Sequence, residues 1–231
     1  MSEERRRSLN HFSLYHFKES YWGLPDEDRR KSLGSWLSQL RIASPMVEVY
    51  QVFPAGADAD LLVWCATPIE DTETTAKLFT ALAGAINPFR ALIEPSKVLW
   101  GYTGPSAYSQ ARSAQEIDPF APKRRAYLVV YPFVKTKEWY LLSQDARQGM
   151  MNEHIRLGKS YTEISQLLLY SFGLQDQEFV VVYEADDLVQ FSDLVRELRS
   201  TDGRLYTERD TPIHTAIYHP AEETLSLWRA T

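Results

Sequence analysis

Residues of the first half of this chain recur in the second half at an offset of 117 residues. Identical pairs near the start of the two halves are Lys18 and Lys135, Trp22 and Trp139, Leu24 and Leu141, Asp28 and Asp145, and Arg30 and Arg147. Self-similarity at one fixed spacing indicates a duplicated structural unit. At 231 residues the chain is long enough for two small domains with a real core. We therefore expect two halves, residues 1–110 and 111–231.

The hydrophobic pattern predicts similar elements in both halves. In the first half, strands are expected at 11–18, 47–53, 60–65 and 98–103, and helices at 26–41 and 70–85. In the second half, strands are expected at 126–133, 178–184 and 211–219, and helices at 143–157, 161–172 and 188–200. Two helix starts carry a capping-box pattern, Ser160-x-x-Glu163 and Asp187-x-x-Gln190. Helices on one face of antiparallel sheets make an α+β fold, and two such halves fit a ferredoxin-like duplication.

The two halves differ at two positions that carry chemistry. At the 117-residue offset Tyr131 falls on Leu14 and His154 falls on Leu37, so only the second half has the phenol and the imidazole. His154 also continues the apolar stripe of an amphipathic helix, in which every fourth residue is apolar: Leu142, Ala146 and Met150. Burying an unpaired imidazole costs about 1–3 kcal/mol, so His154 is either a hydrogen-bonded core residue or part of a site. One functionalised half indicates one site per chain.

Composition excludes several classes of partner. The formal net charge of −6 argues against non-specific binding to nucleic acid or to an anionic membrane. No stretch approaches the length of an apolar membrane span, and the N-terminus has no apolar signal segment, so we expect a cytoplasmic protein. Cys65 is the single cysteine, which leaves no disulfide framework and no cysteine metal cluster.

The histidine spacing permits one kind of metal site. No His-Glu-x-x-His or Cys-x-x-Cys occurs, so a multi-ligand zinc site is not expected. A single histidine can still bind haem iron, because the porphyrin supplies the other four nitrogens. Cations for the haem propionates flank the strand at 126–133, namely Arg124, Arg125, Lys135 and Lys137. Apolar side chains for the slot are Met150, Met151, Leu157, Tyr161, Leu167 and Leu168, although these residues also fit an ordinary core.

Several motifs of the second half resemble the chlorite dismutase family, which includes the coproheme decarboxylases of bacterial haem synthesis. The matching segments are Tyr131-Pro132-Phe133-Val134-Lys135, Trp139-Tyr140-Leu141-Leu142, Glu153-His154, Tyr170-Ser171-x-Gly173-Leu174-x-Asp176, Leu198-Arg199-x-Thr201-Asp202 and Asp210-Thr211-Pro212. In the first half the best match is the segment 21–25. The resemblance implies a dimeric α+β barrel of two ferredoxin-like halves, assembled as pentamers, with haem in the C-terminal half.

The resemblance also implies roles for individual residues. His154 falls on the proximal iron ligand, and Asp202 falls on the carboxylate that accepts a hydrogen bond from that ligand. Tyr131 matches the tyrosine that coproheme decarboxylases use as a radical to take a hydrogen atom from a propionate. Lys135 matches the residue that holds a propionate, and Trp139 matches a tryptophan beside the porphyrin. Leu167 stands thirteen residues after His154, where chlorite dismutases carry a distal arginine.

The resemblance leaves several functions open. The first is peroxide-dependent decarboxylation of coproheme to haem b, in which coproheme is both the substrate and the redox centre. Leu167 is neutral and disfavours the second, which is chlorite decomposition or weak peroxidase activity. No histidine lies between His16 and His154. Because a distal histidine that would help peroxide to react is missing, a third possible function is that of a haem carrier or sensor without turnover. A duplicated domain that has lost haem is the fourth.

Overall fold

The computed structural model describes residues 7–108 and 113–229 and divides into two compact units. One unit comprises Met1–Tyr102 with Thr215–Thr231, and the other comprises Thr103–His214. The expected boundary between residues 110 and 111 lies outside the described residues. The C-terminal segment, which the sequence pattern placed in the second half, groups with the first unit. None of the helices in the described ranges is both long and apolar enough to cross a membrane.

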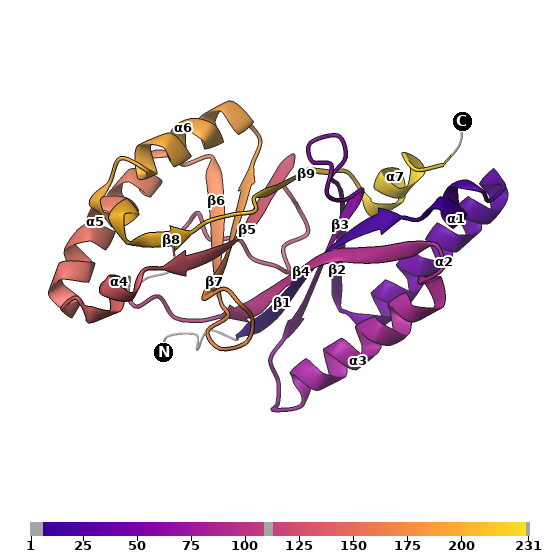
Figure 1. The fold of residues 1–231 in the computed structure, drawn as a ribbon, viewed down its shortest axis with the longest axis horizontal. Coiled ribbons are helices and arrows are strands. Elements are labelled where there is room, and N and C mark those ends of the chain that lie inside the picture. Colours follow the sequence, from indigo (N-terminus) through magenta and orange to yellow (C-terminus); the bar gives the residue numbers. More distant parts are fainter. Residues whose placement is uncertain (1–6, 109–112, 230–231) are drawn as a thin grey trace. The chain divides into compact units, whose positions relative to one another are not determined.

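The first unit is an antiparallel sheet that carries two long helices, α2 and α3 (Figure 1). Its elements, in chain order, are β1 (Ser8–Phe17), α1 (Glu19–Trp22), α2 (Asp26–Ala43), β2 (Met46–Gln51), β3 (Leu61–Pro68), α3 (Thr74–Ile86), η1 (Asn87–Phe89), β4 (Ile93–Thr103), β9 (His214–Tyr218) and α7 (Ala221–Ser226). The strands lie in the order β4-β1-β3-β2-β9, and each neighbouring pair is antiparallel.

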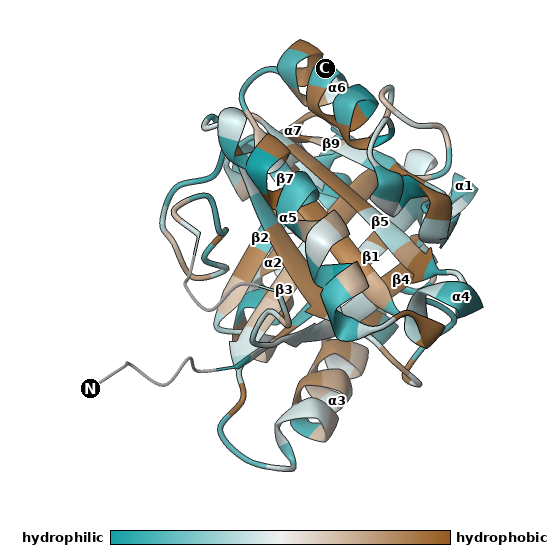
Figure 2. Cartoon of the chain, turned by 90° about the vertical axis from the view of Figure 1, so that its left-hand side faces the viewer, coloured by the Kyte–Doolittle hydropathy of each residue, from teal (hydrophilic) through white to brown (hydrophobic). Residues whose placement is uncertain are grey.

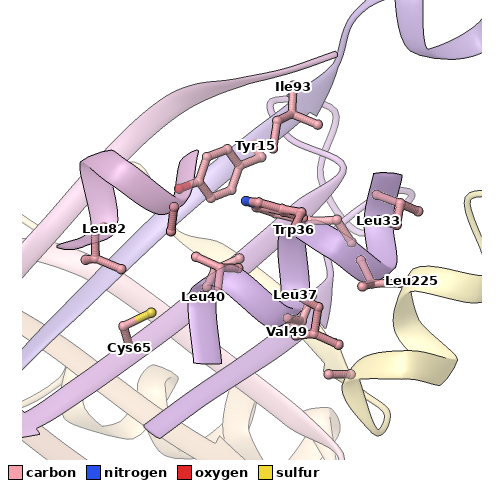
Figure 3. Packing of buried hydrophobic residues seen from close by; sticks show 14 of the residues in the cluster. Tyr15, Leu33, Trp36, Leu37, Leu40, Val49, Cys65, Leu82, Ile93 and Leu225 are labelled. Atoms are coloured by element: carbon pink, nitrogen blue, oxygen red, sulfur yellow. The ribbon is translucent and has the colours of Figure 1, made fainter. Parts of the chain in front are cut away.

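One apolar core joins α2 and α3 to a face of this sheet. The inner face of α2 follows the i, i+3, i+4, i+7 spacing of a helix and consists of Leu33, Trp36, Leu37 and Leu40. Figure 3 shows Trp36 close to Tyr15 of β1, and the two rings meet edge to face with centroids 5.2 Å apart. Cys65 of β3 lies in the same cluster. Burial raises the pKa of its thiol to about 12, so it packs as an apolar side chain.

The second unit repeats this arrangement. Its elements, in chain order, are β5 (Tyr127–Lys135), α4 (Lys137–Leu141), α5 (Gln144–Ser160), β6 (Ile164–Tyr170), β7 (Phe179–Ala185), α6 (Leu188–Leu198), η2 (Asp202–Tyr206) and β8 (Thr207–Arg209). The strands lie in the order β6-β7-β5-β8, again all antiparallel. Shifted by 117 residues, α2 falls on 143–160, which is α5, and β3 falls on 178–185, which is β7. The 117-residue offset found in the sequence therefore also relates corresponding helices and strands of the two units.

Helices α5 and α6 cover one face of the second sheet. Figure 2 shows both helices in front of the hydrophobic strands β5 and β7. The cluster beneath them combines Val129 and Tyr183 of the sheet with Leu157 of α5 and Leu194 of α6. Asp187 caps α6 as predicted, because its carboxylate accepts hydrogen bonds from the first free backbone N–H groups of the helix.

The helix expected at 161–172 is wrong, because this segment contains the strand β6. Ile164–Tyr170 pairs in register with β7 along its whole length. The spacing of Ile164, Leu167 and Leu168 fits a helix as well as it fits a buried strand, so periodicity alone could not decide between them. Ser160 is not a cap either. It lies in the last turn of α5, where its hydroxyl donates to the carbonyl oxygen of Leu157 at 2.6 Å.

Candidate functional site

One face of β5 points Tyr131 and Lys135 toward the helices. Successive side chains of a strand alternate between its faces, so Val129, Tyr131 and Lys135 share one side. Val129 and Tyr131 pack in the cluster that also contains Phe191 of α6. Lys135 stands four residues beyond Tyr131, about 13 Å along an extended strand. The two residues expected to act on substrate therefore mark two separate points of one surface.

Tyr131 is paired with a second buried tyrosine. Its ring is stacked on Tyr183 with centroids 6.4 Å apart and planes at 24°, and the two hydroxyls are hydrogen-bonded. Burial, and then the neighbouring Tyr183, hold the pKa of Tyr131 well above its usual value. The phenol consequently stays protonated at any physiological pH. Oxidation of Tyr131 would have to remove a proton together with the electron.

A cavity of about 330 Å³ opens beside Tyr131. Its other walls come from α6, from the residue after α6 and from the chain after β8, namely Phe191, Ser192, Val195, Arg196, Arg199, Asp210 and Ile213. The wall combines apolar side chains with two guanidinium groups and one carboxylate. Such a cavity suits a flat or aliphatic group that carries a negative charge.

Lys135 is held in place by the segment η2 and by an indole ring. Its Nζ donates to the carbonyl oxygen of Gly203 at 3.1 Å and lies 4.2 Å from the centroid of Trp139. Trp139 is itself buried and packs against Tyr206. Burial, and then the charge of Arg204, lower the pKa of Lys135 to about 8. Lys135 is thus a cation at neutral pH that would gain from a nearby carboxylate.

His154 occupies the inner side of α5 as a neutral imidazole. Burial, and then the Lys135 ammonium, lower the pKa of His154 to about 4. Within residues 7–108 and 113–229 no hydrogen bond or ion pair joins the ring to Asp202, whose side chain is exposed. The expected Asp202–His154 hydrogen bond is therefore not formed in this structure. A neutral ring with a free lone pair is the form in which histidine binds a metal.

The inner face of α5 is less covered than that of α2. All of α5 is described, and none of its residues is fully buried, whereas α2 buries five of its residues. At the 117-residue offset the buried Leu33 and Leu37 of α2 become the half-buried Met150 and His154 of α5. A partly covered apolar face with one neutral imidazole and a nearby ammonium fits a haem, which needs an apolar slot, one basic nitrogen and cations for its propionates. His154, Met150, Trp139 and Lys135 are the residues that would hold it.

Leu167 does not share a face with Tyr131. In the strand register Tyr131 lies opposite Val181, and Val181 lies opposite Leu168. Leu168 is therefore the β6 residue on the side of the helices, and its side chain is 43% exposed. Leu167 points to the other face, where it is 3% exposed. Residue counting from His154 selected Leu167, but one step along a strand reverses the face on which a side chain lies.

Four further residues belong to this surface and had no predicted role. They are Tyr183, Arg199, Arg204 and Asp210. Arg199 and Asp210 stand within the family-like motifs at 198–202 and 210–212, which was the available signal. Tyr183 could have been found from strand alternation, because it lies opposite Val129 in the register. The Arg204–Asp210 ion pair, at 2.5 Å, spans irregular chain and has no periodic pattern.

Comparisons with known proteins give a consistent result. The family model described as chlorite dismutase matches residues 31–218. The coproheme decarboxylase of Mycolicibacterium smegmatis is 31% identical over 173 residues, which cover 72% of this chain and 70% of that protein. The coproheme decarboxylase of Staphylococcus carnosus is 28% identical over 210 residues, which cover 81% of this chain and 83% of that protein.

Solved structures show the same mixed α+β fold. A mutant chlorite dismutase from Candidatus Nitrospira defluvii superposes with a TM-score of 0.83 over 96% of each chain, at 23% identity. The structure of that dismutase in complex with imidazole gives a TM-score of 0.80, covering 95% of this chain and 94% of that chain, at 22% identity. At this level of identity the likeness concerns the fold.

Proposed function

The chain belongs to the chlorite dismutase family, and from this premise we propose that it converts coproheme to haem b by peroxide-dependent oxidative decarboxylation. The observation that carries the proposal is the face of β5, where a buried phenol and an ammonium group point toward the helix that carries His154. Two curated relatives named coproheme decarboxylase support the same reaction. Bound coproheme, with peroxide, supplies the oxidising chemistry.

Each protein residue then has a separate task. His154, neutral at working pH, would ligate the iron, and Trp139 and Met150 would line the porphyrin. Lys135 would hold one propionate by charge. Tyr131 would give up its phenolic hydrogen and then take a hydrogen atom from the propionate carbon next to the ring. Loss of one further electron and of carbon dioxide leaves a vinyl group, so each propionate and one peroxide yield carbon dioxide, a vinyl group and two waters.

The same proposal includes the assembly and the fold. Both units contain the succession strand, helix, strand, strand, helix, strand. The strands lie in the order β4-β1-β3-β2 in the first unit and β8-β5-β7-β6 in the second, so in each unit the fourth strand of the succession pairs with the first. This order supports two ferredoxin-like repeats, residues 1–110 and 111–231, as a dimeric α+β barrel. By analogy with the family we propose a cytoplasmic homo-oligomer, in the form of a pentamer.

A haem carrier without turnover is the second candidate. It is favoured by Leu168, which puts an apolar side chain on the Tyr131 face where a polar group would help peroxide to react. The experiment that separates the two candidates is a titration of the purified protein with coproheme, followed by peroxide. Two successive losses of product mass, each matching one decarboxylation, are expected for the enzyme. Bleaching of the Soret band without a mass change would leave the carrier and refute the decarboxylase.

The affinity for coproheme should depend on pH through Lys135. The pKa of Lys135 in the free protein is about 8, so its charge is present below pH 8 and is lost as the pH rises above it. We expect the coproheme Kd, measured by tryptophan fluorescence quenching, to be constant from pH 6 to 8 and to rise by up to about tenfold per pH unit above that. Lys135→Met should bind more weakly and lack the rise. An unchanged wild-type Kd from pH 7 to 9.5 would contradict a propionate contact at Lys135.

A further inference from the structure

Tyr183 of β7 is a second phenol paired with Tyr131. In the strand register Tyr131 lies opposite Val181, so Tyr183 is its diagonal neighbour on the same face of the sheet. Diagonal neighbours on adjacent strands are within reach of aromatic side chains, and here the two rings stack at 24° with centroids 6.4 Å apart. The two hydroxyl groups share a hydrogen bond, and either phenol can be its donor. The O–H group of one ring therefore lies against the oxygen of the other.

Tyr131 borders the cavity, whereas Tyr183 lies one layer deeper. Among the residues that the structure describes, the cavity walls include Tyr131 but not Tyr183, which is 5% exposed. The ring of Phe191, another residue of the wall, packs against Tyr183 with centroids 5.2 Å apart. A molecule in the cavity can therefore touch the phenol of Tyr131 but not that of Tyr183. Any chemistry of Tyr183 must pass through Tyr131.

The hydroxyl of Tyr183 lies in otherwise apolar surroundings. Its neighbours in the cluster include Val129, Ala185 and Leu194. Burying a hydroxyl among such side chains is unfavourable unless it is hydrogen-bonded, and within the described ranges its hydrogen bond runs to Tyr131. Burial raises the pKa of Tyr183 to about 12, so this phenol keeps its proton at neutral pH. A protonated phenol is too weak a base to take the proton of Tyr131, but its O–H bond can give up a hydrogen atom.

We propose that Tyr183 is a second radical site, which exchanges a hydrogen atom with Tyr131 and holds the oxidising equivalent away from the cavity. The inference rests on the proposed function, which removes one electron and one proton from Tyr131. The hydrogen atom of the Tyr183 hydroxyl then moves to the phenoxyl oxygen of Tyr131. The O–H bond of Tyr183 breaks, that of Tyr131 forms, and the unpaired electron passes to Tyr183. Because the same kind of bond breaks and forms, the step is reversible, and its return restores the Tyr131 phenoxyl when a propionate is in place.

The first test places the spin by electron paramagnetic resonance in Tyr183→3-fluorotyrosine. The unpaired electron of a phenoxyl couples to a fluorine on its own ring, so a fluorine splitting reports spin on residue 183 and not on another tyrosine. The protein is loaded with coproheme, mixed with peroxide and frozen within milliseconds. We expect a fluorine-split signal that disappears when Tyr131→Phe is added. A tyrosyl signal without fluorine splitting, or a split signal that persists with Tyr131→Phe, would overturn the exchange.

A second test separates the exchange from the proposed reaction. In the apo protein, photogenerated ruthenium(III) tris-bipyridine replaces coproheme and peroxide as the oxidant. A fluorine-split signal from position 183 that requires the Tyr131 hydroxyl supports the exchange even if coproheme is never decarboxylated. No split signal from position 183, under conditions in which Tyr131→3-fluorotyrosine gives one from position 131, refutes the exchange even if decarboxylation proceeds.

The matched control is Tyr127→3-fluorotyrosine. Tyr127 lies on the same strand and the same face as Tyr131, but its partner in the register is Ala185, which has no hydroxyl. We expect any fluorine splitting from position 127 to be the same with and without the Tyr131 hydroxyl. A Tyr127 signal that also vanishes with Tyr131→Phe would make Tyr131 a general entry point for oxidation and overturn the specific pairing with Tyr183. Unchanged melting temperatures of the fluorinated proteins verify that the fold is intact.

Discussion

Replacing Tyr131 by phenylalanine should stop decarboxylation while coproheme remains bound. Phenylalanine keeps the ring that stacks on Tyr183. It has no O–H group, so residue 131 could no longer take a hydrogen atom from the propionate. We expect the rate of vinyl formation in single turnover with peroxide to fall by at least about 100-fold. The coproheme Kd should stay within about threefold, because His154 and Lys135 are unchanged. Product mass after a fixed time gives the rate, and the Soret band gives the affinity.

The matched control is Tyr127→Phe. Tyr127 lies on the same strand and the same face as Tyr131, four residues earlier, and no catalytic role falls to it. The same loss of a hydroxyl there should leave turnover unchanged. Burial holds the pKa of Tyr131 well above its usual value, so no ionisation of this phenol should appear in the rate profile from pH 6 to 9. Wild-type turnover by Tyr131→Phe would remove the tyrosine from the reaction.

The element pattern was predictable wherever the two halves could be compared. β2 shifted by 117 residues falls on 163–168, which overlaps β6 at all but its first position. The repeat thus contained the information that the apolar spacing of Ile164, Leu167 and Leu168 lacked, and it would have replaced the wrong helix by a strand. Periodicity is ambiguous for short apolar runs, whereas a duplicated unit must form the same hydrogen bonds twice.

Where residues of the candidate site follow a regular period, the face on which their side chains lie can be derived from the sequence. Tyr131 and Lys135 are four apart on a strand, and an even separation keeps them on one face. His154 follows Met150 at a helical spacing on the inner side of α5. Leu167 was assigned to the distal side by counting thirteen residues from His154, through the turn after Ser160. An irregular turn does not fix which face of the following strand a given residue occupies. The β6 side chain on the same face of the sheet as Tyr131 is therefore that of Leu168, not that of Leu167.

The charged part of the cavity could not be derived from the sequence. Arg199, Arg204 and Asp210 lie between the end of α6 and the start of β9, around η2 and the short strand β8, where no period links one side chain to the next. Their meeting depends on the path of that connection. Asp202 also lies in this connection. Its match to a family motif did not reveal that its side chain would be exposed.

Replacing His154 by alanine should abolish specific haem binding. In the proposed site the neutral imidazole of His154 is the iron ligand, and without it the iron would have no protein ligand. We expect the affinity for coproheme and for haem b to fall by at least about 100-fold and the Soret band to move to that of the free porphyrin. Free imidazole should restore the wild-type spectrum in His154→Ala, since the deleted side chain leaves room beside Met150. His219→Gln, in the other unit, should bind haem as the wild type does.

The apo protein offers a separate check on His154. Its pKa is about 4 in the folded state and about 6.5 when unfolded, so the unfolded chain takes up the proton first as the pH falls. Folded wild-type protein must therefore lose stability between pH 6.5 and pH 4, and the lost part should be smaller in His154→Ala. His11, with the same lowered pKa, contributes equally to both proteins and cancels in the comparison. An equal loss of stability in the two proteins between pH 7 and pH 4.5 would mean that the fold does not lower the pKa of His154.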